Sequence, residues 1–204
     1  PPRSTLFPYT TLFRSPFFVL SAIYFVNCIS YISAMTADKV QILDEAAILA
    51  RLKRMAYEIY EANFSAKKLV LIGIDERGGY LAGLLEDFLK DICPHKIELL
   101  DAQLDREAEE GIGITLTGDL EKLANQHIIV VDDVLYSGTT MLNVVAILLQ
   151  VRPQSIQTAV LIDRGHRAMP VSSDFVGMDL ATTIQQHVYF EKGKGKKKMN
   201  AFIM

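Results

Sequence analysis

Apolar residues recur along the chain in two patterns, one typical of helices and one typical of buried strands. After Asp44, a residue type that often caps helices, every third or fourth position is apolar, which predicts a helix of roughly five turns. The apolar positions of this helix are Ile48, Leu52, Met55 and Ile59. Helical spacing returns over residues 80–92 and 139–151, and each of these stretches stops before a proline.

Short apolar runs alternate with the predicted helices. Residues 68–74 and 127–134 contain nearly continuous apolar runs, as expected of strands that are buried on both faces. Further strand-like runs are residues 96–104, 156–163, 175–180 and 187–190, and the polar segments at 75–79 and 105–113 read as loops. Strands that alternate with helices of this length require crossover connections. We therefore predict an α/β fold with a mostly parallel central sheet flanked by helices.

The first 34 residues differ in character from the rest of the chain. Residues 16–37 carry no charge and are long enough to read as a membrane span or an uncleaved signal anchor. Residues 5–15, however, resemble the in-frame translation of a DNA sequencing adapter. We therefore expect residues 1–34 to be a non-native leader and residues 35–191 to be the functional domain. Residues 192–204 would be a lysine-rich tail, in which the run KGKGKKK is disordered.

Composition and charge narrow the class of partner. The chain has 204 residues and is half apolar, which is enough to bury a core of single-domain size. Cys28 and Cys93 have no CxxC spacing and no nearby histidine cluster, which argues against a disulfide framework or a zinc site and fits a reducing cytoplasm. The net charge is −3, and residues 1–34 and 192–204 together hold seven positive charges, so residues 35–191 carry −10. Such an acidic body disfavours nucleic acid as a partner.

The densest candidate chemistry is the string VVDDVLYSGTT at residues 130–140. Asp132 and Asp133 come at the end of an apolar strand, and open α/β sheets bind ligands beyond the carboxyl ends of their strands. The glycine-containing turn at residues 137–140 leads directly into a helix. Backbone N–H groups, hydroxyls and the positive end of the helix dipole would therefore converge on an anion. Two acceptors suited to vicinal hydroxyls, next to a phosphate cradle, match a phosphorylated ribose.

Other interpretations of this string have less support. The GxxxxGK[ST] spacing of a Walker-type loop is missing, and no GxGxxG follows a strand. The two aspartates could bind a metal directly, but no histidine or further nearby carboxylate accompanies them, so the sugar interpretation ranks higher. Solvated strand ends beside an ordinary helix cap would explain an isolated pair of aspartates, but not the whole string.

The string resembles the phosphoribosyl-pyrophosphate (PRPP) binding signature of the type I phosphoribosyltransferases, and the resemblance spans most of residues 41–191. The segments ILDEAAILARLKRMAYEIYEAN and AVLIDRGHRAMPVSSDFVGMDL are similar to the PyrR group of that family, which comprises uracil phosphoribosyltransferases that also regulate pyrimidine operons. The resemblance implies the type I phosphoribosyltransferase fold, a central, mostly parallel sheet flanked by helices with a small hood subdomain.

The resemblance also implies roles for the residues of the string. Asp132 and Asp133 would be catalytic residues that hold the 2′ and 3′ hydroxyls of the ribose. The 5′-phosphate would be bound by Ser137, Gly138, Thr139 and Thr140. The family often has arginine at the position of Thr139, so this chain departs from the pattern inside its phosphate site.

Three further parts of the site follow from the same resemblance. The pyrophosphate loop corresponds to Asp75, Glu76, Arg77 and Gly78. The family often has Lys-Thr-Arg-Gly there, so Asp75 replaces a lysine. Arg106 aligns with the catalytic arginine of a flexible loop that closes over PRPP. The base pocket would be formed by Asp163, Arg164, Val176 and the residues that follow as far as Tyr189.

The implied reaction transfers ribose 5-phosphate from PRPP to a nucleobase. Uracil is favoured because the PyrR group prefers it, while a purine such as hypoxanthine or guanine stays open. Mg²⁺ would be the cofactor, bound mainly through the oxygens of PRPP and not by a protein cage. The partners would thus be PRPP and a nucleobase, with no membrane, and the resemblance implies a homo-oligomer of two or more subunits.

Two other functions remain as alternatives. One is a regulator that binds pyrimidine-operon RNA with little catalysis. The acidic body disfavours it, as does Tyr57, which stands where that group commonly has histidine, although Arg54 and Arg167 are retained. His166 and Arg167 could reach a base or an RNA, or merely cap a strand. The other alternative is an inactive relative, which the departures at Asp75 and Thr139 suggest.

Overall fold

The main sheet has six strands in the order β4-β3-β2-β5-β6-β7 in the computed structural model, which describes residues 39–105, 113–183, 186–193 and 198–204. Every neighbouring pair is parallel except β3 with β4. The strands are β2 (Lys68–Ile74), β3 (Lys96–Asp105), β4 (Gly113–Leu116), β5 (His127–Leu135), β6 (Ser155–Asp163) and β7 (Phe175–Asp179). The predicted mostly parallel sheet is confirmed.

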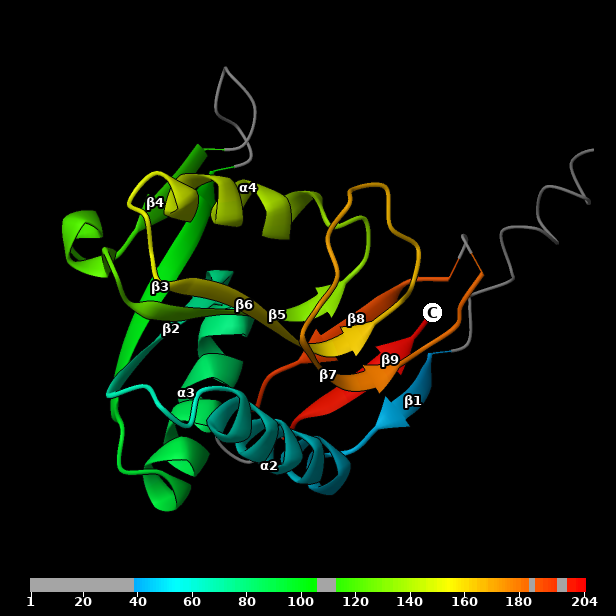
Figure 1. The fold of residues 1–204 in the computed structure, drawn as a ribbon. Coiled ribbons are helices and arrows are strands. Elements are labelled where there is room, and N and C mark those ends of the chain that lie inside the picture. Colours follow the sequence, from blue (N-terminus) through cyan, green and yellow to red (C-terminus); the bar gives the residue numbers. More distant parts are fainter. Residues whose placement is uncertain (1–38, 106–112, 184–185, 194–197) are drawn as a thin grey trace, which may run out of the picture. The chain divides into compact units, whose positions relative to one another are not determined.

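Helices cover both faces of this sheet (Figure 1). One face carries α2 (Glu45–Ala62) and α3 (Asp75–Ile92), and the other carries α4 (Thr139–Leu149) and the short 3-10 helix η1 (Leu120–Leu123). Along β2, Leu71 packs on the side of α2 and α3, whereas Ile72 packs on the side of α4. Both faces of the central strands are therefore buried, which explains their continuous apolar sequences.

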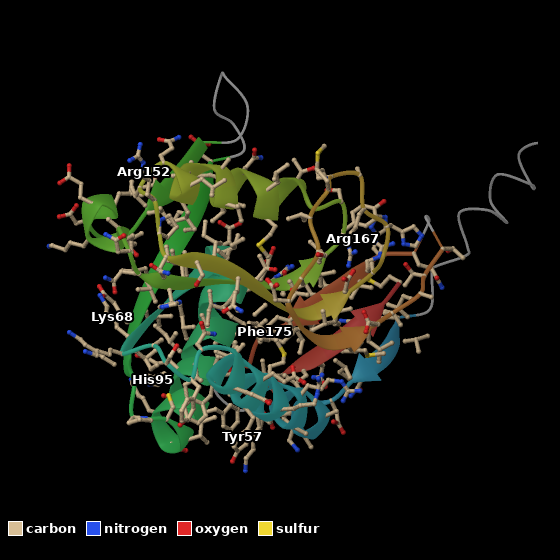
Figure 2. All side chains as sticks on the ribbon, viewed as in Figure 1. Tyr57, Lys68, His95, Arg152, Arg167 and Phe175 are labelled. Carbon is tan, nitrogen blue, oxygen red and sulfur yellow. The ribbon has the colours of Figure 1, made fainter. Side chains whose placement is uncertain are left out.

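The first long helix begins at the residue that the sequence predicts. The side chain of Asp44 accepts a hydrogen bond from the Ala47 N–H at 2.8 Å and so satisfies a backbone donor that the helix itself cannot pair. Its buried stripe consists of Ile48, Leu52, Met55, Ala56 and Ile59. Phe175, at the start of β7, lies between the sheet and this helix (Figure 2).

The second long helix begins at Asp75, not at residue 80, so the prediction of a loop over residues 75–79 is wrong. Asp75 has a φ of 51°, which lets the chain turn sharply out of β2 and enter the helix at once. A Cβ on Gly73 would lie only 2.3 Å from the Cα of Gly79, so the helix packs directly on the strand that precedes it. The glycines that suggested a loop serve this close approach.

A second, antiparallel sheet has the strand order β1-β9-β8 (Figure 1) and is called the small sheet below. The apolar run at 187–190 predicts β8 (Val188–Glu191), but no sequence pattern predicts β1 (Val40–Leu43) or β9 (Asn200–Ile203). Phe190 and Ala201 are buried in the same core cluster as α2 and α3. The small sheet is the hood that the family resemblance implies.

The lysine-rich run KGKGKKK lies between β8 and β9. Its residues 194–197 are outside the described part of the chain, and so is the leader at residues 1–34. The disorder expected for the run and the division of the chain at residues 34 and 191 stay predictions. Within the described ranges, no helix is both long enough and apolar enough to cross a membrane.

We predict that Gly73→Ala lowers the free energy of unfolding by roughly 1–3 kcal/mol or more, because the added methyl group would overlap the backbone of α3. The matched control is Gly83→Ala, in α3, because a Cβ on Gly83 meets nothing within 4 Å. That variant should gain about 0.5–1 kcal/mol from helix propensity. Urea unfolding of both variants checks the prediction, and equal effects would contradict it.

Candidate functional site

The carboxyl ends of β2 and β5 lie side by side where the strand order of the main sheet reverses. From β2 the chain proceeds outward through α3 to β3, and it later returns past β2 to β5, whose following helix α4 covers the opposite face. Open α/β sheets bind ligands at such a point, because the two connections diverge and leave a crevice. A cavity of about 360 Å³ is present there.

This crevice cavity is lined mainly by charged side chains. The charged residues are Asp75, Glu76, Arg77, Asp132 and Asp133, and Ile74, Leu104, Val134 and Thr140 complete the lining. The structure therefore brings together three segments that the sequence could only propose separately. These are the end of β5, the start of α3 and the start of α4.

The two aspartates of β5 are held in different ways. The Asp133 N–H donates a hydrogen bond to Asp132 Oδ1 at 2.8 Å. Asp133 Oδ2 lies 3.4 Å from Nη1 of Arg77, and the Asp133 side chain is 14% exposed. The backbone thus holds one carboxylate, while an arginine from a different element pairs with the other.

Burial raises the pKa of the Asp132 carboxyl well above its ordinary value. The negative charge of Asp133 raises this pKa further, as does that of Asp75, while the hydrogen bond from the Asp133 N–H lowers it. The protein therefore keeps a carboxylate at a point where its charged form is disfavoured. A hydroxyl donor or a cation placed beside Asp132 would favour the charged form, which is the behaviour expected of a ligand site.

Asp75 has a contact that shapes the cavity. Its Oδ1 accepts a hydrogen bond from the Leu104 N–H at 2.9 Å, which joins the end of β2 to the end of β3. A lysine at this position could not accept that bond, because an ammonium group is only a donor. Where the resemblance leads us to expect a lysine, Asp75 thus ties two strand ends together.

Arg77 lies in the first turn of α3 and contacts the small sheet. Its guanidinium carbon is 4.3 Å from the centroid of the Tyr189 ring in β8. The neighbouring Glu76 forms an ion pair with Lys192, just beyond the same strand. Gly78 has a packing role, since a Cβ there would lie 2.5 Å from the Val131 carbonyl oxygen. Of the four predicted pyrophosphate residues, the first three line the crevice and the fourth lets the helix approach β5.

The predicted phosphate turn leads into α4 as the sequence indicates. Ser137 Oγ donates to Thr139 Oγ1 at 3.1 Å and accepts from the Thr139 N–H at 3.3 Å. Gly138 has a φ of 82°, and a Cβ on it would lie 2.7 Å from Cγ1 of Val171, so glycine is required there. Backbone N–H groups in the first turn of a helix have no carbonyl partner within it and can bind an anion. Thr140 lines the crevice, so this turn lies beside the two aspartates.

A second cavity, of about 380 Å³, lies at the carboxyl ends of β6 and β7 and is lined by residues 163–167 and 179–182. Asp163 Oδ1 accepts from the Gly165 N–H at 2.8 Å, and its Oδ2 pairs with Arg167. His166 lies in the same wall, and its ring is 6.4 Å from that of Tyr136. Two of the three named base-pocket residues, Asp163 and Arg164, line this cavity.

Arg164 is committed to holding the wall of the second cavity together. Its Nε donates to Thr182 Oγ1 at 3.1 Å, and its Nη2 donates to the carbonyl oxygens of Thr183, at 3.3 Å, and Gln186. Its guanidinium carbon also lies 4.2 Å from the centroid of the Tyr136 ring. With only 3% of the residue exposed, Arg164 fixes the segment around Thr182 and is not free to reach for a base.

Two other predicted site residues are not in these cavities. Val176 pairs with Val160 and packs against the core cluster on the side of α4, because alternate residues of a strand face opposite sides. Arg106 lies outside the described residues, and its role stays a prediction. Sequence reasoning missed Leu104, which no motif marks, and Lys192, which it assigned to a tail. The ion pair with Glu76 places Lys192 beside α3, and the pairing of β8 with β9 shows that strands of one sheet lie on both sides of it in the sequence.

Comparison with known proteins identifies the family. The phosphoribosyl transferase domain matches residues 39–193. The chain belongs to the phosphoribosyltransferase family. It is similar to two relatives named "Bifunctional protein PyrR". The relative from Macrococcus caseolyticus is 38% identical over 175 residues, covering 81% of this chain and 99% of the relative. The one from Ligilactobacillus salivarius is 36% identical over 167 residues, covering 76% and 94%.

Solved structures show the same fold. A hypoxanthine phosphoribosyltransferase from Trypanosoma cruzi matches with a TM-score of 0.69 and 18% identity, covering 82% of this chain and 95% of that one. A hypoxanthine-guanine phosphoribosyltransferase from Bacillus anthracis matches with a TM-score of 0.66 and 16% identity, covering 82% and 99%. At such low identity these matches establish the type I phosphoribosyltransferase fold alone.

We predict that Asp132→Asn stabilises the protein at neutral pH. The Asp132 carboxyl has a higher pKa in the folded protein than in the unfolded chain. The free energy of unfolding therefore falls as the pH rises from the unfolded-state pKa through the folded-state pKa. Asparagine keeps an acceptor for the Asp133 N–H but never acquires the charge. The variant should therefore exceed the wild type in free energy of unfolding near pH 7, and the gap should close as the pH falls toward about 4. Urea unfolding across this pH range tests the prediction, and parallel stability curves would refute it.

Proposed function

We propose that the chain transfers ribose 5-phosphate from PRPP to a nucleobase and releases pyrophosphate. The observation that carries this proposal is the crevice cavity at the point where the strand order reverses. Asp132, Asp133, the start of α3 and the start of α4 all contribute to its wall. An acidic pair beside a helix N-terminus suits a sugar that carries both a diol and a phosphate.

The proposed roles follow from where each group lies. Asp132 and Asp133 bind the ribose hydroxyls, and their negative charge favours the positive charge that develops on the sugar as the bond to pyrophosphate breaks. The turn of residues 137–140 binds the 5′-phosphate at the start of α4. Arg77 neutralises the departing pyrophosphate, and Arg106 is proposed to close over it.

Mg²⁺ is the proposed cofactor, and the donors around the crevice suit it. Within the described residues, no group of three or more His, Cys, Asp or Glu side chains is arranged to hold a metal ion. Asp132 and Asp133 nevertheless offer the carboxylate oxygens that Mg²⁺ accepts, and this ion commonly binds through one or two carboxylates together with substrate phosphates. When bound, it would neutralise charge on the leaving pyrophosphate.

Uracil is the proposed base, and the support for it is the resemblance to the PyrR group. The second cavity is the proposed base site, because it lies at the end of β6 and Asp163 pairs in register with Leu135 of β5. Hypoxanthine or guanine is the alternative. The solved structures named for those bases support only the fold, so they do not favour a purine.

RNA binding is the less favoured function, because both basic residues retained from that pattern are committed to contacts within the protein. Arg54 Nη2 donates to the carbonyl oxygens of Val176, at 2.7 Å, and Gly177, at 3.0 Å, and its Nη1 pairs with Glu58 at 2.5 Å. Arg167, which lies toward the carboxyl ends of the strands (Figure 2), pairs with Asp163. These contacts leave little free positive charge for RNA phosphates. A cytoplasmic location and a homo-oligomeric state also stay predictions.

We predict that Asp133→Asn lowers kcat/KM with PRPP at least 100-fold, because the charge opposite the developing sugar cation is lost. The fold should remain intact, as measured by circular dichroism and urea unfolding. Asp87→Asn, the same change at an exposed position of α3, should leave turnover within about twofold and serves as the control. Unchanged pyrophosphate release by Asp133→Asn would falsify the ribose assignment.

We predict that the protein releases pyrophosphate from PRPP and Mg²⁺ with uracil in preference to hypoxanthine and guanine. The same preparation should show no salt-sensitive retention of pyrimidine-leader RNA on filters, because the body of the chain is acidic. Turnover with a purine would correct the base. RNA retention without turnover with any base would support the regulator, and neither activity would support an inactive relative.

A further inference from the structure

The small sheet contacts two consecutive residues at the start of α3. The guanidinium of Arg77 lies over the ring of Tyr189 in β8, with 4.3 Å between the guanidinium carbon and the ring centroid. Lys192, just past the end of β8, forms an ion pair with Glu76. Both contacted residues line the crevice cavity, whereas Tyr189 and Lys192 do not. These contacts join segments more than one hundred residues apart in the sequence.

Arg77 needs a positioning contact more than most arginines. It is the one cation among the described residues that line the crevice, and four carboxylates share that lining. Its side chain is 41% exposed, and the pairing with Asp133 is a single contact of 3.4 Å. A long side chain of this kind loses about 2 kcal/mol of rotamer entropy when it is fixed, so a weak ion pair by itself holds it poorly.

An aromatic ring suits this task because of how a guanidinium binds. The group stacks through its flat face and donates hydrogen bonds from its edge. Stacking on Tyr189 therefore restricts Arg77 without occupying the N–H donors that an anion needs. Lys192 contributes by neutralising Glu76, the carboxylate adjacent to Arg77 in the chain, which would otherwise compete for the guanidinium.

We propose that Tyr189 is a positioning residue for the pyrophosphate half of the site, and that it acts by holding Arg77 between its ring and Asp133. The inference rests on the proposed function, since it assumes that Arg77 binds pyrophosphate. It makes strand β8 of the small sheet part of the PRPP site.

The test compares Tyr189→Leu with Tyr189→Phe. Leucine removes the aromatic face, so the KM for PRPP and the inhibition constant of pyrophosphate should each rise about two- to fivefold, and kcat should fall by no more than a similar factor. Phenylalanine keeps the face and should retain wild-type values. Calorimetric titration with Mg²⁺ and pyrophosphate, without any base, should show the same loss for Tyr189→Leu, which makes the result independent of turnover.

Two controls separate positioning from a general loosening of the small sheet. Phe190→Leu changes the neighbouring buried residue, whose ring lies 6.4 Å from that of Tyr80 in the core. It should lower the melting temperature and leave the KM for PRPP unchanged. In the Arg77→Ala background, where binding should already be roughly tenfold weaker, adding Tyr189→Leu should cause no further loss. An equal rise in KM for Phe190→Leu, or a full additional loss in the double variant, would overturn the proposal.

The outcomes also distinguish this inference from the function on which it rests. If Arg77→Ala binds PRPP and pyrophosphate as the wild type does, the assignment of the pyrophosphate site fails. If Arg77→Ala weakens binding but Tyr189→Leu does not, the site stands and the positioning role of Tyr189 is wrong.

Discussion

The site depends on how closely the start of α3 packs against the ends of two central strands. Gly73 and Gly79 bring the helix onto β2, and Gly78 brings it within contact of the Val131 carbonyl in β5, one residue before Asp132. A side chain at Gly73 or Gly78 would hold the helix away from the sheet, because a Cβ at either position would overlap backbone atoms. Arg77 is one residue before Gly78, so the same packing that lets the helix approach β5 brings a guanidinium to Asp133.

Electrostatics then decides what the crevice can accept. A lining with four carboxylates and one guanidinium repels a bare polyanion. The pKa of Asp132 is raised, so the crevice disfavours the negative charge of that side chain as well. Such a site suits a ligand that presents hydroxyl donors and brings its own cations. Asp75 is one of these four carboxylates and so adds to this requirement. Asp75 also ties the ends of β2 and β3 together.

The small sheet shows how distant parts of the chain complete the site. β1 and β9 come from opposite ends of the described chain, and β9 pairs with both β1 and β8. Phe190 and Ala201 attach this sheet to the core beside α2 and α3, while Tyr189 faces Arg77. Phe190 thus packs in the core and Tyr189 contacts the proposed site, because adjacent residues of a strand point to opposite faces of its sheet.

The sequence by itself determined two kinds of element. These are the strands that are buried on both faces of the sheet and the helices whose first residues form a recognisable cap or turn. The continuous apolar runs of β2 and β5, the Asp44 cap and the turn before α4 are local signals. They predict that Asp132 and Asp133 lie toward the end of a strand and that residues 137–140 lead into a helix, as the structure shows. Only the tertiary structure decided that residues 75–79 are helical, that Val176 faces the core and that Arg164 is a structural tie. It alone revealed β1, β9 and the contacts of Tyr189 and Lys192. Those features depend on which strands become neighbours. Strands of four residues, such as β1 and β9, are too short to show a periodic pattern, and β1 and β9 pair across more than one hundred residues of sequence.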